Sequence, residues 1–211
     1  CYNPALHQND DNASYIINAK SLMERHAPYF LYLPKIEPDI SAAIGYPLML
    51  IPVYSVFGVD VPLLNAYTLL WAFGAGFLCY FFLKTYVSKH IALIITFIFL
   101  SNPYFTVFAS LIMTEIPYLF WSLLAMYLVS RFENNQNSNF LKLGIVLTFF
   151  MVYFTRAIGA GIFVAFAVYS LFKINWSELK QLSLKNKLNT LLRNNYIILT
   201  ICLFITLILS P

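Results

Sequence analysis

Apolar residues fill most of the chain after residue 60, whereas residues 1–60 mix polar, aromatic and apolar positions. The apolar part divides into six runs, at residues 61–83, 91–113, 116–130, 140–155, 157–172 and 196–209. Several runs are at or below the length of about 17–25 residues that a helix needs to cross a bilayer. The pattern predicts an all-α protein in two parts, an outer polar segment over residues 1–60 and a transmembrane helix bundle over residues 61–211.

Two positions are expected to break these runs. A single helix over residues 140–172 would be roughly 50 Å long, against a hydrocarbon core of about 30 Å. We therefore expect two helices that turn near Arg156. At Asn102-Pro103 the proline removes a backbone donor and clashes with the preceding turn, so the run 91–113 should kink or end there.

The polar segment contains two helical patterns. Over residues 13–23 the apolar positions recur at a spacing that indicates a loosely amphipathic helix, and Asp10, Asp11 and Asn12 stand at its start. Acidic and Asn side chains suit the exposed amides of a first helical turn, so one interpretation of Asp11 is an N-cap. Residues 46–57 predict a second helix, which is too short to span a bilayer and suited to lie at its surface.

Composition places the chain among the polytopic membrane proteins. Hydrophobic residues make up 60% of the sequence and charged residues 10%, with a mean hydropathy of +0.72, whereas about a quarter of a soluble domain is charged. The chain starts at Cys1 and stops at Pro211 after an apolar run, so we expect a fragment of a longer protein. Its 3 cysteines have no metal-binding or redox spacing, so we expect no disulfide framework.

The charged residues predict an orientation in the membrane. If the runs cross in turn, one set of connecting loops holds most cations and the opposite set holds only Arg156. The cationic set is Lys84, Lys89, Arg131, Lys142, Lys173, Lys180, Lys185, Lys187 and Arg193. Cytoplasmic loops carry an excess of Lys and Arg, so residues 1–60, Glu115 and Arg156 are expected on the outer face of a bacterial inner membrane. The basic loops lack the density and the stacking aromatics of a nucleic-acid site, so no nucleic-acid partner is expected.

Several motifs resemble those of one enzyme family. Residues 11–58 contain Asp-Asn-x-x-Tyr, then Ala-Lys-Ser-Leu, a gap with prolines, and Gly-Tyr-Pro-Leu-x-Leu-x-Pro-x-Tyr-x-x-Phe-Gly. This order resembles the first outer loop of GT-C glycosyltransferases, the membrane enzymes related to protein O-mannosyltransferases (glycosyltransferase family 39) and aminoarabinose transferases. Further matches are Ser101-Asn102-Pro103, Thr114-Glu115-Ile116-Pro117 and Tyr153-Phe154-Thr155-Arg156. Residues 42–47, Ala-Ala-Ile-Gly-Tyr-Pro, depart from the Tyr-Pro-Pro-Gly-Tyr-Pro that is common in the family.

The resemblance implies a helix bundle of GT-C type with outer juxtamembrane helices. It also implies inverting transfer of a hexosyl or pentosyl group from a polyprenyl-phosphate donor to a glycan, lipid or protein acceptor. Asp11 matches the family's loop aspartate and would act as the general base that removes the acceptor's proton. Asp10 beside it either strengthens this base by like-charge repulsion or is a second solvated acid.

The outer loops also supply candidate substrate-binding residues. Arg156 would stabilise the charge that develops on the leaving phosphate, or it pairs with Glu115 at a helix end. Glu115 is interpreted as a cap or an arginine partner rather than a second base. Tyr15 and Tyr46 stand in the motifs that resemble the family's loop, which implies substrate contacts for both. No cofactor is expected; the adjacent aspartates would bind a divalent cation only weakly, and the histidines share no metal-ligand spacing.

Two other functions remain open. A transporter or flippase would place ionisable residues or interrupted helices near mid-membrane and would show internal repeats, whereas the centres of these runs are nearly free of charge. A non-catalytic membrane assembly protein would use Asp11 only as a helix cap. An upstream helix and a downstream extracytoplasmic domain in the full-length sequence would distinguish the enzyme from both.

Overall fold

Helices make up the regular structure that the computed structural model describes, which covers residues 11–27, 44–173, 196, 199–200 and 203–205. The main elements are α1 (Asp11–Arg25), α2 (Gly45–Phe57), α3 (Val61–Leu83), α4 (Lys89–Leu100), α5 (Pro103–Ala109), α6 (Glu115–Asn134), α7 (Asn139–Thr155), the 3-10 turn η1 (Ala157–Gly159) and α8 (Ala160–Phe172). No strand occurs in these ranges, which confirms the expected all-α class. The predicted run at 196–209 lies mostly outside the described residues.

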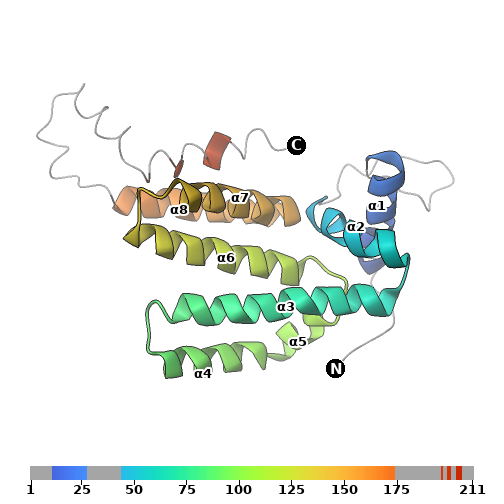
Figure 1. The fold of residues 1–211 in the computed structure, drawn as a ribbon, viewed down its shortest axis with the longest axis horizontal. Helices are drawn as coiled ribbons and strands as arrows, with labels where there is room; N and C mark the ends of the chain where they lie inside the picture. Colours follow the sequence, from blue (N-terminus) through green and yellow to red (C-terminus); the bar gives the residue numbers. More distant parts are fainter. Residues whose placement is uncertain (1–10, 28–43, 174–195, 197–198, 201–202, 206–211) are drawn as a thin grey trace, which may run out of the picture.

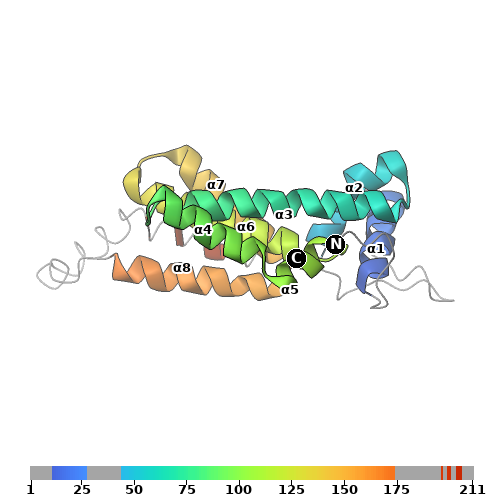
Figure 2. The same ribbon diagram turned by 90° about the horizontal axis from the view of Figure 1, so that it is seen from below.

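The helices α3, α6, α7 and α8 lie along the length of the molecule, and α4 lies beside α3 (Figure 1). α3 packs on α6, and α6 packs on α7. At one end α1 stands across the direction of α3 in both views, with α2 between α1 and the bundle (Figures 1 and 2). We call this the α1–α2 end; it also contains the start of α6 and the end of α7. The opposite end holds the α3–α4 and α6–α7 connections.

The predicted break at Asn102-Pro103 is confirmed. α4 ends at Leu100 and α5 begins at Pro103, and the two helices are bent by 67°. Asn102 is the N-cap of α5, where its side chain accepts a hydrogen bond of 2.9 Å from the amide of Tyr104. Proline suits the first helical position because its missing amide would have no partner there. The run 91–113 therefore forms two helices and a short connection to α6.

The predicted turn near Arg156 is also confirmed. α7 ends at Thr155, and Arg156 has an extended backbone, with φ −151° and ψ 132°. The chain then turns so tightly that a Cβ on Gly159 would lie 2.6 Å from the carbonyl oxygen of Val152. Only glycine fits this close approach of backbone to backbone. Residues 140–172 therefore form two helices with Arg156 at the junction.

α3 is the single described helix that is both long and apolar enough to cross a bilayer, and α4 with α5 is a second candidate if the bent pair counts as one span. α2, α7 and the segment Ala157–Phe172 are apolar but shorter. Large apolar side chains are exposed along the outside of α3 and α4, with Phe77 66% and Phe97 69% exposed. Contiguous apolar surface of this kind is rare on soluble monomers and suits contact with lipid.

Cations collect at the end opposite to the α1–α2 end, as the alternation of the runs predicted. We call it the basic end. Its described cations lie in the helix connections or in the terminal turns beside them: Lys84, Lys89, Arg131, Lys142 and Lys173. The other predicted cations, Lys180, Lys185, Lys187 and Arg193, lie outside the described residues. Glu115 and Arg156 lie at the α1–α2 end, at the start of α6 and the end of α7.

Candidate functional site

A small apolar core holds α1 on α2 at the α1–α2 end. Ile16 and Ala19 of α1 are 6% and 0% exposed, and they belong to one cluster with Tyr46 and Leu50 of α2. The ring of Tyr15 lies edge-on to the ring of Tyr46, with 5.4 Å between the ring centroids. The amphipathic helix predicted at residues 13–23 therefore buries its apolar face on the predicted short helix that follows it.

Tyr46 anchors α2 to α3. Its side chain has no exposed surface, and its hydroxyl lies 2.7 Å from Oγ1 of Thr68. Thr68 donates its own proton to the carbonyl of Leu64 at 3.2 Å, so Tyr46 is the donor in this pair. Burial raises the pKa of the Tyr46 hydroxyl above its ordinary value, and the group stays neutral at physiological pH. The structure thus places Tyr46 in the packing beneath the site.

Gly45 brings α2 against the end of α7. A Cβ at this position would lie 2.4 Å from the carbonyl oxygen of Phe154 and 2.8 Å from the amide nitrogen of Thr155. Real Cβ atoms do not approach backbone this closely, so glycine is required for the contact. The contact joins the Gly-Tyr-Pro motif to the Tyr-Phe-Thr-Arg motif, and Arg156 follows directly.

The Gly45→Ala variant is expected to loosen this contact. The added methyl group meets backbone atoms, which cannot rotate away, so we expect a loss of stability of about 1–3 kcal/mol, as in an overpacked core. Thermal unfolding of the full-length protein in detergent measures the effect. Gly161→Ala is the matched control, because a Cβ at Gly161 has no atom within 4 Å and alanine favours the helix. Equal melting temperatures for the two variants would contradict this account of the α2–α7 contact.

Arg156 and Glu115 form an ion pair beside this contact. Nη1 of Arg156 donates to Oε1 of Glu115 at 2.7 Å, and the two side chains are 39% and 26% exposed. Glu115 lies in the first turn of α6, where the helix dipole favours a carboxylate. The predicted alternative in which Arg156 pairs with Glu115 at a helix end is therefore confirmed. One carboxylate oxygen of Glu115 accepts this bond from Nη1. The guanidinium has further N–H donors, and the Arg156 side chain is partly exposed.

Tyr15 connects α1 to the start of α6. Its hydroxyl lies 3.5 Å from Oγ1 of Thr114, the residue before Glu115. Asp11 is the first residue of α1. Asp10 lies outside the described residues. Asp11 begins the helix that Tyr15 joins to Thr114, and its role as general base stays a prediction.

The structure buries several polar residues at this end to which the sequence assigned no role. Asn65 is 3% exposed, Thr68 0% and Thr114 2%. Asn65 and Thr68 are three residues apart on the otherwise apolar α3, a spacing that puts both on one helix face and that could have signalled a polar contact.

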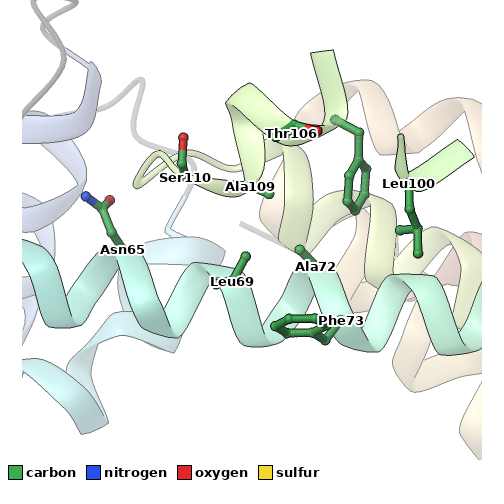
Figure 3. A pocket seen from close by; sticks show the side chains of 9 residues that line it. Asn65, Leu69, Ala72, Phe73, Leu100, Thr106, Ala109 and Ser110 are labelled. Atoms are coloured by element: carbon green, nitrogen blue, oxygen red, sulfur yellow. The ribbon is translucent and has the colours of Figure 1, made fainter. Parts of the chain in front are cut away.

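Asn65 also lines a cavity of about 260 Å³ between α3, α5 and the end of α4. Figure 3 shows the Asn65 amide rising from α3 toward the segment that carries Ser110, with Leu69, Ala72 and Phe73 following along α3. Asn65 therefore puts polar atoms in the part of this cavity near the α1–α2 end, and the lining residues other than Asn65, Ser110 and Thr106 are apolar.

Within the described ranges, no three His, Cys, Asp or Glu side chains come together in a way that could hold a metal ion. The weak divalent-cation site suggested by the adjacent aspartates includes Asp10, which lies outside those ranges.

Comparison with known proteins adds one finding. The sequence profile of the family described as dolichyl-phosphate-mannose-protein mannosyltransferase matches residues 46–210. No curated protein and no solved structure matches the chain. The matched part begins at Tyr46 and includes Glu115 and Arg156, whereas α1 with Asp11 and Tyr15 precedes it.

Proposed function

This chain belongs to the dolichyl-phosphate-mannose-protein mannosyltransferase family, and on that premise we propose that it transfers a sugar from a polyprenyl-phosphate donor at its α1–α2 end. Members of the family are integral membrane glycosyltransferases that use a lipid-phosphate-linked mannose. The donor class follows from the family; the site and the mechanism are our proposal. We further propose a hexosyl group, mannose, rather than a pentosyl group, and a protein, glycan or lipid acceptor.

The partly exposed Arg156 is the observation that supports this site. It stands at a helix junction at one end of an apolar bundle, and its side chain is 39% exposed although Glu115 accepts a hydrogen bond from one of its nitrogens. A guanidinium can bind a phosphate through two parallel hydrogen bonds. We propose that Arg156 contacts the phosphate of the donor and that Glu115 positions the guanidinium.

The proposed reaction is a single displacement. A hydroxyl or amine of the acceptor attacks the anomeric carbon and forms the new glycosidic bond, while Asp11 takes its proton as general base. The bond between the anomeric carbon and the phosphate oxygen breaks, and the electron pair leaves with the polyprenyl phosphate. Arg156 stabilises the negative charge that develops on this phosphate. The configuration at the anomeric carbon is inverted.

The other candidate residues receive positioning roles in this proposal. Tyr15 links α1 to Thr114, the residue before Glu115, and we propose that this link positions the start of α1 for the reaction. Tyr46, which has no exposed surface, supports α2 from below, and its substrate contact stays a prediction. Asp10 remains either a modifier of Asp11 or a solvated acid. We propose no cofactor for the reaction.

Membership in a glycosyltransferase family argues against the two other classes, the transporter or flippase and the non-catalytic assembly protein. The assay that tests the enzyme uses the unmutated full-length protein in vesicles with a polyprenyl-phosphate mannose donor. We expect release of polyprenyl phosphate and appearance of mannose on an acceptor. If the donor stays unconsumed in the presence of protein, glycan and lipid acceptors, the assembly protein becomes the better account.

The proposal also places the protein in the membrane. We propose a multi-pass protein of a bacterial inner membrane with the α1–α2 end outside, because cations collect at the opposite end. Cysteines introduced singly at Ser14 and Glu115 should react with an impermeant thiol reagent from outside, and one at Ser183 only after the membrane is opened. Labelling of the Ser14→Cys variant from the cytoplasmic side alone would overturn this orientation.

A further inference from the structure

A second cavity extends from the basic end toward the middle of the bundle. It has a volume of about 360 Å³ and lies between α3, α6, α7 and α8. Along α6 it extends from Met126 to Glu133, a length of about 10 Å. The end of the cavity nearest to Glu115 on α6, Met126, is about 16 Å from Glu115 along the helix. The cavity is therefore separate from the α1–α2 end.

The deep part of the cavity is apolar and its mouth is polar. Phe149, Ile162 and Phe166 line the part farther from the basic end, and Ile162 lies near the start of α8. Glu133 and Tyr169 line the part at the basic end. An apolar space at membrane depth favours hydrocarbon over water, because water would find few polar partners there.

Charges of both signs stand at the mouth. Nζ of Lys173 lies 2.5 Å from Oε1 of Glu133 and 5.1 Å from the centroid of the Tyr169 ring. The Tyr169 hydroxyl donates to the same carboxylate oxygen. Hydrogen bonds from Lys173 and Tyr169 hold the pKa of Glu133 below its ordinary range, and the bond to Glu133 raises the pKa of Lys173. Both groups are therefore charged at neutral pH, and both stay partly exposed, at 30% and 39%.

We propose that this cavity binds a phospholipid with a zwitterionic headgroup, with one acyl chain between α6 and α8. The headgroup's ammonium would meet the carboxylate of Glu133, and its phosphate would meet the ammonium of Lys173. Each contact is a charge-assisted hydrogen bond. A purely anionic headgroup would be repelled by the Glu133 carboxylate. The opposite charges of Glu133 and Lys173 therefore favour phosphatidylethanolamine over phosphatidylglycerol.

Native mass spectrometry of the full-length protein tests the site. The protein, purified in mild detergent, is mixed with phosphatidylethanolamine or with phosphatidylglycerol of the same acyl chains. We expect retention of phosphatidylethanolamine in preference to phosphatidylglycerol. Glu133→Gln should weaken that retention by about ten- to a hundredfold, the loss expected for one contact to a charged group. Lys89→Gln, an exposed cation at the same end that does not line the cavity, is the control and should change little.

A second variant tests the acyl chain without changing charge. Ala165 lines the cavity on α8, whereas its neighbour Val164 is 57% exposed and does not line it. Ala165→Trp should fill the space and remove the bound lipid, and Val164→Trp should retain it. Equal retention of the two phospholipids by the unmutated protein would overturn the headgroup assignment. Lipid retention that survives both Glu133→Gln and Ala165→Trp, or its complete absence, would overturn the site.

Discussion

The Asp11→Asn variant of the full-length protein is expected to lose sugar transfer while it remains folded. Asparagine has nearly the same shape as aspartate, and Asp11 is the first residue of α1 rather than the cap before it, so the helix should be kept. It cannot accept a proton at neutral pH. General-base catalysis commonly contributes on the order of a hundred- to ten-thousand-fold, and we expect a loss in that range when sugar from a polyprenyl-phosphate donor is followed.

Asp10→Asn is the matched control for this experiment, since it changes the neighbouring carboxylate in the same way. It should cost much less activity if Asp10 is a solvated acid. The two variants should also have the melting temperature of the unmutated protein. Near-normal transfer by Asp11→Asn would show that Asp11 is only a helix residue and that the base lies elsewhere.

Arg156→Lys is expected to weaken binding of the donor by about tenfold or more, because lysine keeps the charge but loses the planar fork that binds two phosphate oxygens. Lysine can still reach Glu115, so expression should stay near normal. The apparent donor affinity is measured from initial rates at increasing donor concentration in the full-length protein.

The Glu115→Gln variant tests the positioning role of Glu115 separately from the phosphate binding proposed for Arg156. Glutamine keeps the shape of the side chain and can still accept a bond from Arg156, which lies 2.7 Å from Oε1. As a positioning residue, Glu115 should affect donor affinity less than Arg156 does. A fall in expression for Arg156→Lys with unchanged donor affinity would instead make the ion pair purely structural.

The helix breaks could be predicted from the sequence because each has a local cause. Proline at position 103 cannot continue a helix, and residues 140–172 are too long for one span. The number of membrane spans could not be predicted in this way. Among the described helices, α3 alone is long and apolar enough to cross a bilayer without a bend. The breaks at Pro103 and Arg156 shorten the other runs, and α6 carries Glu115, Arg131 and Glu133 within its ends.

The site could be predicted only in part, because its contacts join segments far apart in the chain. The residue types pointed to Arg156 and Glu115, but two interpretations stayed open until packing of α6 on α7 brought Nη1 within 2.7 Å of Oε1. The burial of Tyr46 depends on Thr68 of α3 and on the glycine before it, which no local pattern reveals. The assignment of Asp11 as the base rests on the resemblance.

The central claim is a one-step transfer at the α1–α2 end with Asp11 as base. Its most direct test is the configuration of the product at the anomeric carbon when the full-length protein uses a polyprenyl-phosphate mannose of known configuration. The account predicts inversion, because the acceptor displaces the phosphate in a single step. Retention would require a covalent sugar–enzyme intermediate, with a carboxylate as nucleophile rather than base, and would contradict it.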